Sequence, residues 1–247
     1  MNSTNSAILA PLVRKLESIA SLSREERQAI ESLPVNGRLL RARQDILHEK
    51  DRPSQCCLIV DGWACRYNLL EEGRRQILSF HIPGDIPDLQ SLHLQIMDHS
   101  LATITACTVA VIPHENLRDL ALRFPRVGGA LWRDTLVDAA IFRAWMTGIG
   151  RRTAFGRIAH LFCEMYLKME AVGLADAHRC ELPITQTDIA DALGLTNVHV
   201  NRVLKEMRSQ ELITLQSNRL VIENWAALSR AGEFDPTYLH LEKRAAA

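Results

Sequence analysis

The sequence predicts an α+β protein in which a region of short strands is followed by helices that end in a helix-turn-helix. Three observations support this fold class: apolar runs separated by turn signals between Val35 and Pro113, a long apolar helix that begins at Pro125, and two capped helices between Thr185 and Gln210. The chain of 247 residues is long enough for two small domains. Its 47% hydrophobic and 23% charged residues are ordinary for a soluble globular protein, which supports a folded core.

The charge balance gives no global sign of a partner. The 29 Lys and Arg residues equal the 29 Asp and Glu residues, so an argument for nucleic-acid binding must rest on where charges lie locally. Residues Met1–Ala7 lack the basic region of a signal peptide, and the most apolar stretch, Gly129–Ile149, is interrupted by four charged residues. We therefore expect a cytoplasmic protein without a membrane partner.

The six cysteines are expected to be thiols, because a chain without a secretion signal stays in a reducing compartment. The sequence has no Cys-x-x-Cys pair, and Cys56 and Cys57 would point to opposite faces of a strand. We interpret every cysteine except Cys180 as a small apolar core residue. Cys180 precedes the helix-turn-helix and is a candidate for an exposed, redox-active thiol. No metal ligands and no catalytic residues are predicted.

The N-terminal half is expected to contain helices and then strands. Between Ala10 and Leu33, apolar residues share one helical face, and Ser23 with Glu26 forms a capping box that opens a second helix. The residues on that face are Leu12, Leu16, Ile19 and Ile30. The apolar runs Leu58–Val60, Ile77–Phe80 and Val109–Ile112 are then separated by the turn signals Asp61-Gly62, Glu72-Gly73 and Pro83-Gly84-Asp85. That rhythm predicts an antiparallel β-roll or barrel.

A long helix is predicted from Pro125 to about Arg151, because proline tolerates the first turn and no strong breaker follows before Gly148. The helix is apolar nearly all round: Val127, Leu131, Leu136, Val137, Ile141, Phe142, Trp145 and Ile149. A surface helix needs one apolar stripe, so we expect this helix to pack on its own domain and on a second copy of itself. We therefore predict a homodimer, with Ile141 as a candidate seam position and with Asp134 and Asp138 interrupting the heptads.

These segments divide the chain into N-terminal helices and a β-roll at 1–124, a long dimerisation helix and hinge at 125–152, and a C-terminal domain with the helix-turn-helix at 153–247. Thr153 can cap a further helix that ends at Gly173. The stretch Leu174–Glu181 is predicted to be a connecting loop.

The helix-turn-helix is the strongest local signal. Thr185 and Asp188 form a capping box for a helix that begins at Gln186, Gly194 ends that helix, and Thr196 caps a second one. The inward residues of the second helix, at i, i+3, i+4 and i+7, are Val200, Val203, Leu204 and Met207. A short helix, a glycine turn and a second amphipathic helix are typical of a helix-turn-helix.

The outward face of the second helix is expected to read DNA, because asparagine pairs with adenine and arginine with guanine in the major groove. This face carries Asn197, Val198, Asn201, Arg202 and Lys205. Thr185 and Gln186, at the start of the first helix, are included in the predicted DNA contacts. Two strands flanking Gln216–Asn218 predict a wing that contacts the backbone through Ser217, Asn218 and Arg219.

From about Leu33 to Leu228 the chain resembles the superfamily of the cyclic-AMP receptor protein and the fumarate–nitrate reductase regulator (Crp/Fnr). The matching blocks are Asp45–His48 with Leu58–Gly62, Leu70–Phe80 with Pro83-Gly84-Asp85, and Gly156–Ala159 with Thr185–Arg202. The resemblance implies a cyclic-nucleotide-binding-like β-roll (jelly-roll), a long dimerisation helix and a winged helix-turn-helix. It also implies a transcription regulator that binds a two-fold symmetric operator as a homodimer, with RNA polymerase as a partner if it activates.

The resemblance places an effector pocket at Gly84, Asp88, His99, Ser100, Phe142 and Arg143. Where the family holds ribose with glycine and glutamate, this sequence has only Asp88, and where the family binds phosphate with arginine and serine it has His99 and Ser100. A cyclic phosphate would lack its guanidinium partner, and Phe142 is apolar. We therefore expect a signal other than cyclic AMP, and no cofactor is identified.

The recognition helix departs from the family as well. Val198 stands where the resemblance predicts a cytosine-reading glutamate, whereas Arg202 matches the family's base-reading arginine. The iron–sulfur branch needs N-terminal cysteines, and the first cysteine here is Cys56. Two alternatives stay open: a haem- or redox-gated regulator that uses His81, His93, His99 or Cys180, and a cupin-like metal-dependent enzyme. The effector, the operator, the target genes and the sign of regulation do not follow from the residues.

Overall fold

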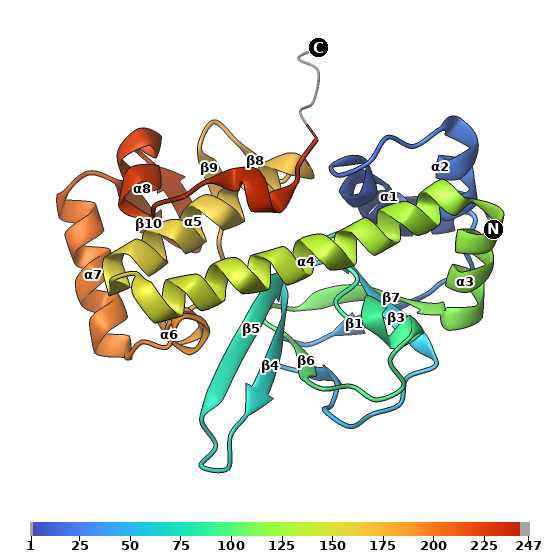
Figure 1. Ribbon diagram of the computed structural model, residues 1–247, viewed down its shortest axis with the longest axis horizontal. Coiled ribbons are helices and arrows are strands. Elements are labelled where there is room, and N and C mark those ends of the chain that lie inside the picture. Colours follow the sequence, from blue (N-terminus) through green and yellow to red (C-terminus); the bar gives the residue numbers. More distant parts are fainter. Residues whose placement is uncertain (1, 243–247) are drawn as a thin grey trace. The chain divides into compact units, whose positions relative to one another are not determined.

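The computed structural model of the chain describes residues 2–242 (Figure 1). The chain forms two compact units. Of the described residues, the roll unit comprises 2–68, Ser79–Asp138 and 241–242. The helix-turn-helix unit comprises Leu69–Leu78 and Ala139–His240. The predicted α+β class is confirmed, since both units combine helices with antiparallel sheets.

The roll unit begins with the predicted helices, α1 (Asn2–Glu17) and α2 (Arg24–Glu31). The capping box of α2 is present: the Ser23 hydroxyl accepts from the Glu26 amide at 3.2 Å, and the Glu26 carboxylate accepts from the Ser23 amide at 2.7 Å. All four residues predicted for the inward face are buried: Leu12, Leu16, Ile19 and Ile30. Their burial contributes about 1.5–3 kcal/mol each, which holds both helices against the sheets.

Two antiparallel sheets follow, and they do not close into a barrel. The first has the order β1-β7-β3, with bounds Asn36–Leu40, Cys107–Pro113 and Gln55–Asp61. The second has the order β2-β6-β4-β5, with bounds Asp45–Leu47, Ser100–Thr103, Ala64–Leu69 and Arg75–His81. The predicted apolar runs lie in β3, β5 and β7, so the β-roll prediction is confirmed and the barrel alternative is not.

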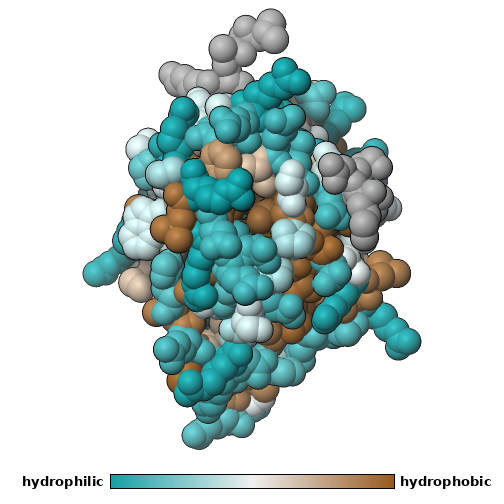
Figure 2. Space-filling model, turned by 90° about the vertical axis from the view of Figure 1, so that its right-hand side faces the viewer, coloured by the Kyte–Doolittle hydropathy of each residue, from teal (hydrophilic) through white to brown (hydrophobic). Residues whose placement is uncertain are grey.

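The first sheet separates two cores, because successive side chains of a strand point to opposite faces. Cys56 packs with the apolar faces of α1, α2 and α3 (His114–Arg123), whereas Cys57 packs between the sheets. The predicted opposite orientation of this pair is therefore confirmed. All six cysteines are buried thiols. The surface of the face shown in Figure 2 is mostly hydrophilic, with hydrophobic side chains between the polar ones.

An ion cluster, largely shielded from solvent, connects α1 with the Pro83–Asp85 turn and with α4 (Pro125–Arg151). Lys15 Nζ lies 2.8 Å from Asp85 Oδ1 and 3.4 Å from Asp134 Oδ1. Burial lowers the pKa of Lys15, but the two neighbouring carboxylates outweigh burial and raise that pKa above its ordinary value. Lys15 therefore stays charged, and Asp134 is paired within the roll unit.

Helix α4 is continuous over the predicted span (Figure 1), so Gly148 does not end it. Its apolar residues form two faces. One face is buried within the chain and includes Val127, Leu131, Val137, Ile141 and Trp145. The other is exposed and contains Trp132, Leu136, Phe142, Met146 and Ile149. Ile141 is 6% exposed, so its side chain belongs to the chain's own core, and the expectation of a seam position there is wrong.

The helix-turn-helix unit contains α5 (Ala154–Ala171), α6 (Gln186–Leu193), α7 (Asn197–Ser209), α8 (Trp225–Ala231) and a sheet of order β10-β11-β9-β8. Thr153 caps α5 as predicted. The prediction of a loop at Leu174–Glu181 is wrong: β8 (Ala175–Asp176) and β9 (Arg179–Glu181) form a hairpin, and β9 pairs with β11 (Arg219–Ile222). Pairing with a strand some forty residues later in the chain leaves no local signal in so short a segment.

Candidate nucleic-acid interface

The first helix of the motif, α6, begins and ends as its residue types predict. The Thr185 hydroxyl accepts from the Asp188 amide at 3.1 Å, and the Asp188 carboxylate accepts from the Thr185 amide at 2.9 Å. Gly194 ends the helix in the left-handed conformation, with φ of 62°. Thr185 and Gln186 are exposed at the start of the helix, where backbone amides also lack intrahelical partners.

The second helix, α7, presents the predicted face. The Thr196 hydroxyl caps it by accepting from the His199 amide at 3.2 Å. The predicted inward residues Val200, Val203, Leu204 and Met207 are all buried. On the opposite side Asn197, Val198, Arg202 and Lys205 are exposed and Asn201 is half-buried. Val198 is 80% exposed on a helix whose other outward residues are polar, which is consistent with a contact surface.

The structure brings the starts of the two helices together. Asn201 Nδ2 on α7 donates to Gln186 Oε1 on α6 at 3.2 Å. Gln186 therefore orients a residue on the outward face of α7. This contact joins two residues that the sequence nominated for DNA binding on separate grounds.

The wing is a hairpin of β10 (Ile213–Gln216) and β11, joined by Ser217 and Asn218. Both turn residues have positive φ, 48° and 62°, as in the tight turns that match the twist of a two-stranded ribbon. The side chains of Ser217, Asn218 and Arg219 are exposed, so they can make contacts outside the chain. The loop contains two residues rather than the three predicted, since Gln216 pairs with Arg219.

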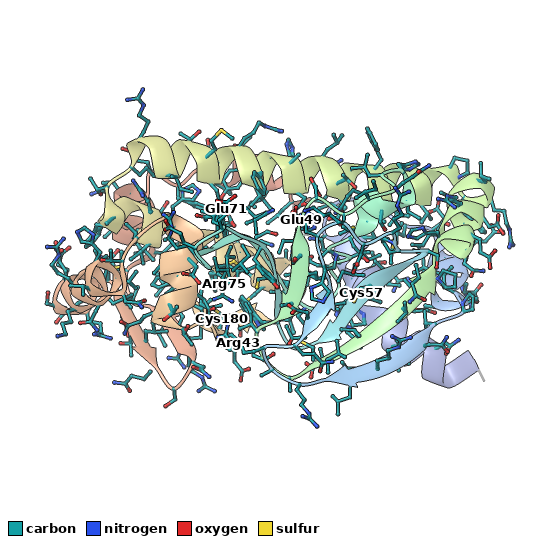
Figure 3. All side chains as sticks on the ribbon, turned by 90° about the horizontal axis from the view of Figure 1, so that it is seen from below. Arg43, Glu49, Cys57, Glu71, Arg75 and Cys180 are labelled. Atoms are coloured by element: carbon teal, nitrogen blue, oxygen red, sulfur yellow. The ribbon has the colours of Figure 1, made fainter. Side chains whose placement is uncertain are left out.

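A residue that sequence reasoning missed supports α6 from another part of the chain. Arg75, labelled in Figure 3, donates from Nη2 to Asp188 Oδ1 and from Nε to Asp191 Oδ2, both at 2.8 Å. Its neighbour Gln76 donates to the Ala192 carbonyl at 3.2 Å. These residues belong to the Leu69–Leu78 segment of the helix-turn-helix unit. No local pattern signals a contact across more than a hundred residues of sequence.

Four of the predicted effector residues lie in the roll unit. Gly84 has φ of 101°, and a Cβ there would lie 2.5 Å from the Pro11 carbonyl oxygen, so only glycine fits this turn. Asp88 is buried; its Oδ1 accepts from the Cys57 amide at 2.8 Å, while Oδ2 has no hydrogen-bond partner among the described residues. Burial raises the pKa of Asp88 to about 7. His99 is buried and contacts Asp98 at 2.8 Å, and Ser100 begins β6.

An arginine that sequence reasoning also missed lies beside these residues. Arg66 on β4 is 8% exposed; its Nε donates to the Pro87 carbonyl at 2.6 Å, and its Nη1 pairs with Asp138 of α4. Burial and then the charge of Arg66 lower the pKa of His99, so His99 is held neutral. A guanidinium is therefore present in this part of the roll, but it is already bound to groups of the chain itself.

The two remaining effector residues, Phe142 and Arg143, lie on α4 in the helix-turn-helix unit, and both are exposed. The effector set as a whole stays a prediction.

The residues of the alternative readings are placed as follows. Cys180 is 5% exposed, so the expectation of an exposed thiol is wrong: its side chain faces the core from β9. Burial raises the pKa of Cys180 to about 11, which keeps the thiol protonated and unreactive at neutral pH. His81 is buried between Ser79 and Asp85, and His93 is exposed. Within residues 2–242, no three His, Cys, Asp or Glu side chains are grouped to hold a metal ion.

Several large apolar side chains of α4 are exposed. Trp132, Leu136, Met146 and Ile149 are 62%, 50%, 67% and 40% exposed, and they recur with Phe142 along one side of the helix. Asp134 and Asp138 form ion pairs with Lys15 and Arg66 of the roll unit. These carboxylates therefore have partners within the chain, although Asp138 borders the exposed face, one turn before Phe142.

Comparisons with known proteins agree with these features. Residues 38–124 match the cyclic nucleotide-binding domain family, and residues 156–231 match the Crp-like helix-turn-helix domain family. The chain belongs to the Crp/Fnr superfamily, and it is a DNA-binding transcription regulator of that type. In the described part of the chain, no helix is both long enough and apolar enough to cross a membrane.

Particular relatives cover most of the chain. The transcriptional activator protein Anr of Pseudomonas protegens is 26% identical over 214 residues, which are 87% of this chain and 86% of Anr. The nitrogen fixation regulation protein FixK of Rhizobium meliloti is 27% identical over 72% of this chain and 78% of its own length. The solved structure of FixK2 from Bradyrhizobium japonicum is similar with a TM-score of 0.73 and 28% identity, over 81% of this chain and 98% of that chain.

Proposed function

We propose that this regulator binds a two-fold symmetric operator as a homodimer and reads bases with the exposed face of α7. The observation that carries the proposal is the position of Asn197, Val198, Asn201 and Arg202 on one face of a helix whose opposite face is buried. A recognition helix enters the major groove by its N-terminal half, which is where these residues lie. A protein that acts on DNA in this way belongs in the cytoplasm.

Each residue on this face has a chemical role in the proposal. Arg202 donates bidentately to guanine, and Asn201, oriented by Gln186, pairs with adenine. Val198 offers only apolar contact, which suits a thymine methyl group. The operator therefore differs from one that is read by a glutamate at this position.

A second set of residues contacts phosphates and fixes the register of the protein on the duplex. Thr185 and Gln186 lie at the N-terminus of α6, where the helix dipole attracts anions, and Ser217, Asn218 and Arg219 lie on the wing. Lys205 adds a positive charge on the outward face of α7. These contacts increase affinity for any sequence and make it dependent on salt.

The dimer forms along the exposed apolar face of α4. Five large apolar side chains on one side of a single helix exceed what an isolated surface helix presents, and a second copy of the helix would cover them. Two recognition helices related by two-fold symmetry then require a palindromic site. Because Anr is a transcriptional activator, we extend the proposal to activation and to contact with RNA polymerase.

The signal sensed by the roll is not cyclic AMP in this proposal. A cyclic phosphate needs a free guanidinium, but Arg66 is paired with Asp138 and His99 is neutral. Calorimetry of the full chain with cyclic AMP should show no stoichiometric heat. Tight binding of one nucleotide per chain would contradict this part of the proposal. The burial of Cys180 argues against the redox-gated alternative at that thiol.

The proposal is tested by selecting operators from random duplexes with the full chain. The selected sites should be palindromes whose half-sites are about one helical turn apart, and two chains should bind each site. Selection of unrelated sequences, or saturation of a palindrome by one chain, would contradict it. A duplex with one half-site scrambled is the matched control and should bind more weakly.

A further inference from the structure

The tip of the β4–β5 hairpin is part of the helix-turn-helix unit. Residues Leu69–Leu78 end β4, form the turn and begin β5, and they cluster with that unit rather than with the roll. Two consecutive residues of this segment bond to α6: Arg75 to Asp188 and Asp191, and Gln76 to the Ala192 carbonyl. The hairpin therefore contacts α6 from near its first turn to near its end.

The Arg75 contact is stronger than an ordinary surface ion pair. Its guanidinium spans two carboxylates at 2.8 Å each, and the Asp188 side chain is 0% exposed. Only 25% of the Arg75 side chain is exposed, so solvent screens the pair less than it screens pairs on an open surface. The planar guanidinium of Arg75 makes two charge-assisted hydrogen bonds, which fix its orientation as well as its distance from α6.

Asp188 connects this contact to the start of α6. One of its oxygens, Oδ1, accepts from Arg75, while Oδ2 accepts from the amide and the hydroxyl of Thr185, at 2.9 and 2.7 Å. The same carboxylate thus caps the helix and receives the hairpin. A shift of Arg75 would change the charge environment of the capping box and the position of the first turn.

The first turn of α6 is in turn connected to the recognition face. Gln186 directly follows the capping residue Thr185, and its side chain accepts from Asn201 on α7. A continuous set of bonds therefore runs from Arg75 through Asp188, Thr185 and Gln186 to Asn201. Residues in one bonded network couple energetically, whereas residues more than about 10 Å apart without shared partners do not.

We propose that Arg75 is a positioning residue for DNA recognition: through Asp188 it holds the start of α6 so that Gln186 orients Asn201 toward its base. The proposal rests on DNA reading by α7. It assigns the hairpin tip a role in specificity, because the tip bonds to the helix that orients Asn201. Anything that displaces the tip changes how well the operator is discriminated.

The test compares full-chain variants on the selected operator and on duplexes changed at single positions. Arg75→Ala should lower affinity for the operator about tenfold, and it should lower the ratio of operator to single-base-variant affinity at the position read by Asn201. Arg75→Lys keeps the charge but loses the fork, so it should recover only part of the ratio. Arg74→Ala is the matched control, because Arg74 lies next to it in the hairpin and its side chain is 70% exposed.

The ratio separates positioning from a merely structural role. If Arg75 only stabilises the fold, Arg75→Ala lowers the folded fraction, and binding to every duplex falls equally, which overturns the proposal. An unchanged ratio with unchanged affinity overturns it too, as does a gain in affinity, which would make the contact a restraint on DNA binding. Should Arg75→Ala not fold, Asp191→Asn removes the more exposed partner of the fork and should lower the same ratio. If the unmodified chain fails to select an operator, the proposed function itself fails.

Discussion

The most direct structural consequence of the exposed face of α4 concerns Met146. Full burial of a methionine side chain stabilises by about 1.5–3 kcal/mol. Because Met146 is 67% exposed, covering it in a dimer recovers about two thirds of that, about 1–2 kcal/mol in each chain and about 2–4 kcal/mol in the pair. Met146→Glu removes this contribution and places two like charges near the two-fold axis. We expect the dimer dissociation constant to rise about 30-fold or more, at about 1.4 kcal/mol for each factor of ten.

Sedimentation over a concentration series, without DNA, measures the change. Leu122→Glu is the matched control: Leu122 is 79% exposed on α3, so the same kind of substitution removes an exposed apolar side chain away from α4. We expect the control to dimerise as the unmodified chain does. Equal dissociation constants for Met146→Glu and the unmodified chain would refute the assignment of this face to dimerisation.

Three further predictions concern stability and reactivity. Lys15→Met should destabilise the fold by about 3–5 kcal/mol in urea titrations, because it removes the cation paired with the buried Asp85 carboxylate and the half-buried Asp134 carboxylate. Arg14→Met at the exposed neighbouring position should cost little, and equal losses would refute the cluster. Cys180 should react with iodoacetamide only after denaturation, as followed by mass spectrometry, because burial raises its pKa to about 11; rapid labelling of the native protein would contradict its placement. Burial raises the pKa of Asp88 from 3.8 to about 7, so the folded chain binds this proton more tightly than the unfolded chain, and the stability from this group is lost as pH rises from about 4 to 7. Asp88→Asn should therefore gain stability relative to the unmodified chain between pH 5 and pH 8, and a constant difference would contradict the shift.

Much of the fold could be predicted because its signals are local. The capping boxes at Ser23 and Thr185, the proline at the first turn of α4 and the left-handed Gly194 each act within a few residues, and each appears as predicted. The face of α7 also follows from a short repeat, since a helix with four buried residues at that spacing must turn the others outward.

The features that could not be predicted depend on contacts between distant segments. Arg75 has no local partner, and its role appears only when the hairpin tip meets α6. In the sequence, Arg66 looks like any charged residue of a strand. Its partners Pro87 and Asp138 are identified only by the fold. The β8–β9 hairpin is stabilised by pairing with β11, so Leu174–Glu181 resembles a loop when it is considered alone.

The role of Asp134 in the long helix could not be predicted from the sequence either. In the sequence it interrupts an apolar pattern, whereas in the fold it pairs with Lys15 on the buried side of α4. Periodicity identifies that a helix is apolar on two faces, but it does not say which face meets the chain's own core. That choice depends on where α1 packs.

Arg202 is the residue that tests most directly whether the outward face of α7 reads bases. Binding of Arg202→Ala to the selected operator and to its single-base variants should be measured at two salt concentrations, with Arg208→Ala as a control of equal charge change in the last turn of α7. We predict that Arg202→Ala costs about 1–3 kcal/mol at the operator and relaxes preference at one base pair of each half-site. Arg208→Ala should weaken all duplexes alike or not at all. If Arg202→Ala binds the operator and its variants with unchanged ratios, Arg202 does not read a base, and α7 contacts DNA differently from this account.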